Sequence, residues 1–252
     1  MKRLLILDCE ATAGGQTEGC APIEIAWITS DSNETKVFQM RPESPVLPCS
    51  TVIHGLTQED VDQFDPIDQV LPEVYEQFRN DITENTFVTA YNTDFDFNLI
   101  HSAFDRYLEK KFQPINQFDT LRLARKVIPL NLVGNHRLDT VFYYLHPNKL
   151  EYLMKLRGMT HDASHDVEIT EQVISSLWKL AEDGLGEKLG LAELSEFANG
   201  PMLLDVWPFG KHYGEPIEDV IKKDSSYVRW FLEQSWADER PDLVYTIEEK
   251  SR

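Results

Sequence analysis

The sequence predicts an α/β protein, with helices packed on the faces of a mixed sheet. Two observations support this fold class. Near the N-terminus, three β-type runs (residues 4–7, 23–28 and 36–40) are separated by short links, which is typical of an antiparallel meander. From residue 86 onward, a strand-like run is followed by segments whose apolar residues recur at helical spacing, and this pattern indicates helices packed against a sheet.

The first run contains four consecutive aliphatic residues (4–7) and is followed by Asp8, Cys9 and Glu10. A short aliphatic run bounded by polar residues predicts a buried strand. Because side chains alternate along a strand, Asp8 and Glu10 should project to one side and Cys9 to the other. Two neighbouring carboxylates repel each other unless a cation lies between them, and Mg²⁺ prefers oxygen ligands. A lone pair of this kind more often simply ends a strand and faces water.

The next segments supply the remaining predicted elements. Thr57 precedes three polar residues, 58–60, and has the character of a helix N-cap. Residues 86–91 are strand-like and lead into a turn that ends at Asp96, where a helix begins. The apolar residues with helical spacing are Val70, Leu71, Val74 and Phe78 in one predicted helix, Leu99, Ile100, Ala103, Phe104, Tyr107 and Leu108 in a second, and those within 121–127, 138–145 and 167–180 in three more.

The composition is that of an ordinary globular protein: of 252 residues, 42% are hydrophobic and 27% charged. No apolar run approaches the roughly 20 residues that span a bilayer, and the first is too short for a secretory signal. Three cysteines without a Cys-x-x-Cys pattern suggest neither a zinc site nor disulfides, so we expect a cytoplasmic protein. The net charge of −19 argues against indiscriminate nucleic-acid binding but not against a nuclease, because bound cations supply positive charge locally.

Glycine-rich sequence interrupts the helical periodicity between residues 183 and 201. We predict a main domain over residues 1–182, a linker over 183–200 and a small C-terminal region over 201–252. About fifty residues rarely support an independent core, so this region should dock on the main domain. Its aromatic residues could stack on bases, although a small apolar core is the favoured role; these residues are Phe209, Tyr213, Tyr227 and Trp230.

Two further acids, Asp96 and Asp166, occupy the starts of predicted helices. A sheet brings helix starts and strand ends together even when they are distant in sequence. Four carboxylates at one place are unfavourable unless cations neutralise them. With two divalent ions the arrangement can hydrolyse a phosphodiester, because one ion lowers the pKa of a bound water and the pair stabilises the attacking and leaving oxygens.

The acids lie in three motifs: Asp8-x-Glu10, Asn92-x-x-Phe95-Asp96 and His161-x-Ala163-x-x-Asp166. In this order they resemble the motifs of the DEDDh 3′→5′ exonucleases. The resemblance covers the predicted main domain, including residues 23–25 and 53–57, and implies an RNase H-like mixed five-stranded sheet flanked by helices, with a small C-terminal appendage. The tail, Phe209-Gly210-Lys211-x-Tyr213-Gly214 followed by Tyr227-x-x-Trp230, resembles the C-terminal region of the exodeoxyribonuclease X branch of this family.

Carried over position by position, the resemblance implies a site for two Mg²⁺ or Mn²⁺ ions. Asp8 would bridge both ions, and Glu10 and Asp166 would hold the ion that activates water. Asp96 would support the second ion, partly through waters. His161 would be the general base, a role that suits its ordinary pKa near 6.5. The pocket for the terminal nucleotide would be lined by Thr12, His54, Gly55 and Phe95.

The sequence departs from the family pattern at two places. Tyr91 stands before the second motif, where the family usually has His, so contacts there should differ. Ala13 stands in place of a glycine and is followed by Gly14 and Gly15, which alters the loop near the 3′ end.

Local alternatives exist around the third motif. His165 and Asp166 could form an HD-type metal pair, which would leave the acids of the first strand unexplained. His165 could also replace His161 as the base, although in a helix it would point about 100° away from Asp166. Asp162 is expected to be a solvated helix cap.

The function implied by the resemblance is metal-dependent 3′→5′ exonucleolytic degradation of DNA to 5′-mononucleotides, with single-stranded 3′ ends favoured and a role in DNA repair. One alternative is an RNA-directed exonuclease on the same fold, since discrimination at the 2′-OH cannot be located in the sequence. Another is a catalytically silent nucleic-acid-binding protein, against which the retained acids argue. The basic clusters at 110–111, 122–126 and 222–223 are expected to be solvated helix faces.

Overall fold

The computed structural model of the chain describes residues 2–14, 17, 19–32, 34–158 and 162–251. The chain divides into two compact units, Met1–Asn199 and Gly200–Arg252. Each unit has a hydrophobic core of its own. The first unit contains the sheet and the acids of all three motifs.

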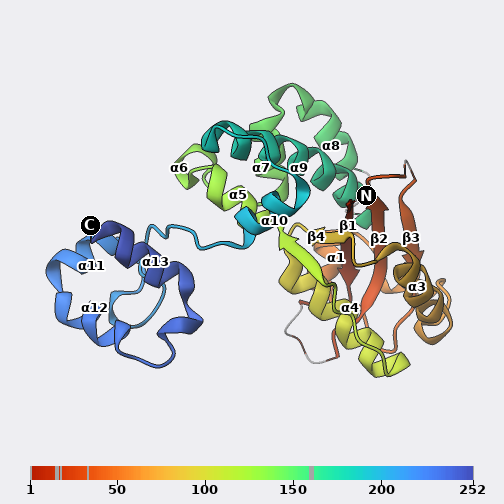
Figure 1. The fold of residues 1–252 in the computed structure, drawn as a ribbon. Helices are drawn as coiled ribbons and strands as arrows, with labels where there is room; N and C mark the ends of the chain where they lie inside the picture. Colours follow the sequence, from red (N-terminus) through yellow and green to blue (C-terminus); the bar gives the residue numbers. More distant parts are fainter. Residues whose placement is uncertain (1, 15–16, 18, 33, 159–161, 252) are drawn as a thin grey trace. The chain divides into compact units, whose positions relative to one another are not determined.

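The sheet has five strands in the order β3-β2-β1-β4-β5 (Figure 1). The strands are β1 (Arg3–Ala11), β2 (Pro22–Thr29), β3 (Lys36–Gln39), β4 (Thr86–Ala90) and β5 (Asn116–Asp119). The β1–β2 and β2–β3 pairs are antiparallel, whereas the β1–β4 and β4–β5 pairs are parallel. The predicted mixed sheet with an N-terminal meander is therefore confirmed.

Helices surround this sheet. Those of the first unit are α1 (Pro48–His54), α2 (Gln58–Val61), α3 (Ile67–Asp81), α4 (Thr93–Leu108), α5 (Thr120–Val127), α6 (Leu130–Val133), α7 (Leu138–Leu145), η1 (Pro147–Lys149), α8 (Leu150–Gly158), α9 (Ala163–Leu185) and α10 (Leu191–Asn199). Within the described part of the chain, no helix combines the length and the apolar character needed to cross a membrane.

β1 extends beyond its parallel partner. β4 pairs with β1 only as far as Ile6, whereas β2 pairs with it as far as Ala11. The end of β1 therefore projects past the carboxyl end of β4, and Asp8 and Glu10 lie in this projecting part. The carboxyl edge of parallel strands is where open α/β sheets usually bind ligands.

Alternation along β1 divides its side chains between two cores. Leu5, Leu7 and Cys9 belong to the core formed with α3 and α4. Ile6 belongs to the core formed with the N-terminal half of α9. The side chains of Ile6, Asp8 and Glu10 share one face of β1, because they are at alternate positions of the strand. Both acids therefore project toward the α9 side of the sheet.

The structure differs from the sequence-based prediction over residues 183–200, where a linker was expected. α9 continues to Leu185, and residues 191–199 form α10, whose Leu194 and Ala198 are fully buried in a core shared with α5, α7 and α9. Glycines flank this short helix and hide its periodicity in the sequence. The second unit starts only at Gly200.

Two basic residues of α5 hold the end of α10. Arg122 Nε donates to the carbonyl oxygen of Ala198 at 3.2 Å, and Lys126 donates to the carbonyl oxygen of Phe197 and lies 4.9 Å from its ring centroid. The last carbonyls of a helix have no partner within the helix, so these contacts satisfy them. The expectation that residues 122–126 form only a solvated face is therefore wrong.

The second unit consists of short helices around an aromatic core. Its elements are η2 (Gly210–His212), α11 (Ile217–Lys223), α12 (Ser225–Leu232), η3 (Ala237–Glu239) and α13 (Pro241–Lys250). Phe209 and Tyr227 pack against the buried Trp207, as the favoured core role requires. Tyr213 is 76% exposed and Trp230 44% exposed, so these two lie at the surface. Docking of this unit on the first stays a prediction.

A polar cluster joins two parts of this unit. The ring of His212 lies between two carboxylates, with Nδ1 3.0 Å from Glu215 and Nε2 3.1 Å from Asp224. The hydrogen bond with Glu215 and, after it, that with Asp224 raise the pKa of His212 above its ordinary value. Lys211 also pairs with Asp224 at 2.6 Å.

We predict that the contribution of His212 to the stability of this unit falls as the pH rises. Because the folded state raises the pKa of His212, protonated His212 stabilises it fully below about pH 6.5, and this contribution is lost as the pH rises through the raised pKa. Replacing His212→Gln should therefore destabilise the protein more at about pH 5.5 than at about pH 9 in denaturant titrations followed by tryptophan fluorescence. Tyr213→Gln, at an exposed neighbour, should show no such pH dependence, and equal effects of His212→Gln at both pH values would contradict the prediction.

Candidate active site

Three of the predicted metal ligands lie together. Carboxylate oxygens of Asp8, Glu10 and Asp166 lie within 4.8 Å of one another. The first two come from the projecting end of β1, and Asp166 comes from the first turn of α9. Glu10 is buried, whereas the other two are half-buried. Hard oxygen donors at this spacing suit a divalent cation such as Mg²⁺ or Mn²⁺.

Asp96 contacts β1 at Cys9 and is not part of this close group. It lies in the first turn of α4, is 3% exposed, and accepts hydrogen bonds from the backbone and the thiol of Cys9. Burial raises the pKa of Asp96. Its Oδ1 is buried without a hydrogen-bond partner among the described residues. A buried carboxylate oxygen in this state has an unmet need for a donor or a cation, so Asp96 fits a metal ligand.

An acid at the end of β5 positions α4. Asn92, the N-cap of α4, makes no side-chain capping bond. Asp119 does so instead: Oδ2 accepts from the backbone N–H and the hydroxyl of Thr93, at 2.9 and 3.0 Å, and Oδ1 accepts from Arg122 N at 2.6 Å. One carboxylate thus caps both α4 and α5. Asp119 was not among the predicted site residues, although an acid just before an apolar helical pattern is itself an N-cap signal.

Two acids hold the first turn of α9. Asp162 is its N-cap and accepts from Ser164 N at 2.7 Å, which confirms the expected cap. Glu24 of β2 accepts from Ala163 N at 2.8 Å. Burial raises the pKa of Glu24 to about 7, the hydrogen bond from Gln39 lowers it, and the Asp162 carboxylate raises it. Glu24 was not among the predicted site residues.

The predicted general base, His161, lies outside the described residues, so its role stays a prediction. His165, the alternative base, is on α9 next to Asp166. Its Nδ1 is buried and has no hydrogen-bond partner in the described part of the chain.

The residues expected to line the terminal-nucleotide pocket surround the segment that follows β1. Thr12 is 1% exposed, and its hydroxyl accepts from Ala21 N at 3.1 Å. His54 is 2% exposed; its Nδ1 accepts from Leu56 N at 3.1 Å, so Nε2 carries the proton and donates to the carbonyl oxygen of Ala11 at 3.2 Å. These two side chains fix the backbone next to the acid cluster. Their contact with a nucleotide stays a prediction.

The other two residues of this set lie on different helices. Gly55 is the C-cap of α1 at φ 78°, a conformation that favours glycine, and its N–H donates to the carbonyl oxygen of Thr51 at 2.7 Å. Phe95 is half-buried in the first turn of α4 and packs against the core beneath that helix. It therefore lies next to Asp96 in the chain.

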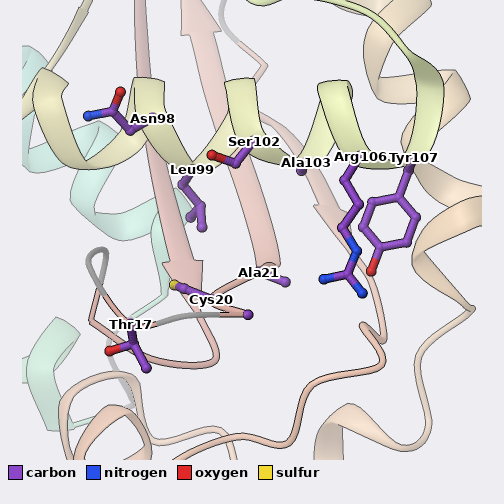
Figure 2. A pocket seen from close by; sticks show the side chains of 10 residues that line it. Thr17, Cys20, Ala21, Asn98, Leu99, Ser102, Ala103, Arg106 and Tyr107 are labelled. Atoms are coloured by element: carbon purple, nitrogen blue, oxygen red, sulfur yellow. The ribbon is translucent and has the colours of Figure 1, made fainter.

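A hollow of about 260 Å³ lies between α4 and the segment that leads into β2 (Figure 2). Leu99 extends from α4 toward Cys20, whose thiol donates to the carbonyl oxygen of Ala13 at 3.1 Å. The lining residues are Thr17, Gly19, Cys20, Ala21, Asn98, Leu99, Ser102, Ala103, Arg106 and Tyr107. The motif acids are not among these lining residues, so the hollow is distinct from the acid cluster.

Tyr91, which replaces the usual His, serves the fold. Its side chain is 9% exposed and packs in the core shared by α5, α7 and α9. Its hydroxyl donates to the carbonyl oxygen of His136 at 2.7 Å. Burial raises the pKa of this phenol.

Comparison with known proteins places this site in context. A family model described as Exonuclease matches residues 5–174. The chain is 22% identical over 193 residues to exodeoxyribonuclease 10 of Escherichia coli K12, which covers 77% of this chain and 74% of the relative. It is 32% identical over 143 residues to the PolC-type DNA polymerase III of Listeria innocua, covering 56% of this chain but 8% of that protein.

The fold is also found among solved structures. Exonuclease I of E. coli, in a zinc-bound complex with single-stranded DNA, superposes with a TM-score of 0.54 at 20% identity. The match covers 73% of this chain, and the chain spans 42% of the exonuclease I chain. At this identity the likeness shows a shared fold.

We predict that Asp119→Ala destabilises the protein by about 1–4 kcal/mol, because each lost helix cap costs about 0.5–2 kcal/mol and Asp119 caps two helices. Chemical denaturation followed by circular dichroism measures this difference. Asp94→Ala, which removes an exposed acid from the first turn of α4, should cost less than about 1 kcal/mol. Equal losses in the two variants would contradict the capping role.

Proposed function

The chain belongs to the exonuclease family, the DEDDh 3′→5′ exonucleases, and we propose that its substrate is DNA, from which it releases 5′-mononucleotides at a two-metal centre. The observation that carries this proposal is the meeting of Asp8, Glu10 and Asp166 within 4.8 Å from two separate elements of the fold. DNA as the substrate is supported by the name of the E. coli relative, an exodeoxyribonuclease.

The residues fit two Mg²⁺ or Mn²⁺ ions. Asp8, Glu10 and Asp166 offer clustered oxygens, and Asp96 offers a buried oxygen that has no hydrogen-bond partner among the described residues. Asp8 would contribute to both ions, Glu10 and Asp166 to one, and Asp96 to the other. When bound, such ions lower the pKa of water and stabilise the charge that develops on the attacking and leaving oxygens.

The chain's own residues supply position and proton transfer. β1 and α9 hold the ligand oxygens in place before substrate arrives, so little reorganisation is needed. His161 would accept the proton of the attacking water as general base. Thr12, His54, Gly55 and Phe95 would shape the space for the terminal nucleotide beside the cluster, with His54 and Thr12 acting by fixing the backbone there.

We predict that purified protein degrades 3′ ends of 5′-labelled DNA in Mg²⁺ or Mn²⁺ and is inactive in excess chelator. Single-stranded DNA should be degraded faster than a blunt duplex, because the terminal nucleotide must leave its stack to enter the site. Activity on a matched RNA alone would make the protein an exoribonuclease, and full activity in chelator would overturn the two-metal proposal. Binding without any product would indicate a silent nucleic-acid-binding protein.

Substitution of the clustered acids separates chemistry from folding. Asp8→Ala and Asp166→Ala should each reduce digestion to background while the circular dichroism spectrum stays native, because each removes an oxygen ligand. Glu76→Ala provides the matched control, since this acid of α3 is 62% exposed. Loss of activity in Glu76→Ala as well, or retention of activity in Asp8→Ala, would contradict the assignment.

For the general base, we predict that His161→Ala slows turnover by about 10²–10⁴-fold, the usual contribution of a general base. Mn²⁺ binding should be nearly unchanged, because His161 is not a proposed ligand. The measurements are single-turnover digestion and a Mn²⁺ titration of the same preparation. An unchanged rate would assign the base elsewhere, with His165→Ala as the next variant to compare.

A further inference from the structure

The start of α9 is joined to the sheet by one buried carboxyl group. Glu24, in β2, is 2% exposed. Its Oε1 accepts the N–H of Ala163, the first residue of α9, at 2.8 Å, and its Oε2 accepts from Gln39 Nε2 at 2.8 Å. Asp162 accepts the next N–H, that of Ser164. The first two N–H groups of α9 are thus bound by two acids, one of which belongs to the sheet.

Glu24 also stands beside the acid cluster within the sheet. It is directly paired with Glu10 across β1 and β2, so the two side chains project from the same face. Asp166 lies in the first turn of α9, the turn whose opening N–H is bound by Glu24. Glu24 therefore connects two acids of the cluster: it binds the start of the helix that carries Asp166, and it lies opposite Glu10 in the sheet.

We propose that Glu24 is a positioning residue of the acid cluster, a role that rests on the function proposed above. Its hydrogen bond to Ala163 fixes the first turn of α9 against β2 and thereby fixes the separation of Asp166 from Asp8 and Glu10. The carboxylates of the cluster repel one another, so the first turn of α9 experiences a force away from the strand. A displacement of about 1 Å in such a site slows catalysis about 10²-fold.

Apolar packing alone does not provide this control. Ala163, Val167 and Ile174 of α9 pack in one core with Ile6, Ala26 and Ile28 and hold the helix on the sheet. Without Glu24 the helix would stay docked, but its first turn would keep only the small apolar contact of Ala163 and would lose its hydrogen bond to β2. Loss of Glu24 should therefore disturb the geometry at Asp166 more than it lowers the stability of the fold.

The experiment compares Glu24→Ala with Glu24→Gln in the full-length protein. Hydrogen exchange should show faster exchange at the start of α9 in Glu24→Ala. Mn²⁺, the probe ion, should bind about 10- to 100-fold more weakly by paramagnetic resonance titration, as when supporting partners of metal ligands are removed. With DNA as substrate, kcat should fall by a similar factor while KM changes little. Glu24→Gln keeps an oxygen that accepts the N–H of Ala163 and should restore all three readouts to within about threefold.

A destabilised control separates positioning from folding. Phe142 of α7 is fully buried and is not one of the motif residues, and Phe142→Leu should lower stability with kcat and Mn²⁺ affinity retained. The proposal is overturned if Glu24→Ala keeps the Mn²⁺ affinity and kcat of the unmodified protein. It is equally overturned if Glu24→Gln is as defective as Glu24→Ala, because the charge and not the hydrogen bond would then matter.

The measurements distinguish an error in the proposed function from an error in the role of Glu24. If the unmodified protein degrades neither DNA nor RNA, that function is wrong, but hydrogen exchange and Mn²⁺ affinity still decide whether Glu24 positions α9. If the unmodified protein is active and Glu24→Ala matches it in every readout, the exonuclease stands and the positioning role fails.

Discussion

Repulsion between carboxylates is the constraint on which this structure depends. Oxygens of Asp8, Glu10 and Asp166 lie within 4.8 Å of one another at a partly buried position, where charges are screened less than in water. The fold holds them from two directions: β1 is fixed between β2 and β4, and α9 is held on the sheet by its apolar side chains. Burial of apolar surface therefore supplies the free energy that keeps these like charges together.

Two further acids, the half-buried Asp119 and the buried Glu24, bind N–H groups at helix starts. Asp119 accepts from the first N–H of α4, and Glu24 accepts from the first N–H of α9. A helix N-terminus favours negative charge, and the N–H of Ala163 lowers the pKa of Glu24, although burial outweighs this effect and raises that pKa to about 7. Asp96 combines both situations, since Cys9 donates to it while Oδ1 has no partner among the described residues.

Local pattern in the sequence was sufficient for the strand that carries the first two acids and for the helices after it. Alternation along residues 4–10 predicted that Cys9 would face away from Asp8 and Glu10, and Cys9 does lie in the opposite core. Contacts between distant residues were beyond such reasoning. Glu24 and Ala163 are 139 residues apart, and Asp119 and Thr93 are 26 apart, so neither hydrogen bond leaves a local signal. The helix α10 was missed because flanking glycines hide its periodicity and because its apolar residues are buried against the distant helices α5, α7 and α9.

Because the chain is acidic, the cations of the proposed function would also be needed to attract the nucleic acid. With 43 acidic and 24 basic residues, the chain offers a polyanion little general attraction. Several basic side chains are engaged within the fold, as Arg122 and Lys126 are at α10 and Lys211 is with Asp224. Attraction of the terminal phosphate then depends on the ions held by the acid cluster, since fields of separate charges fade within about 8 Å. Binding and turnover should therefore both require the metal, unlike binding by basic proteins, which depends on Lys and Arg.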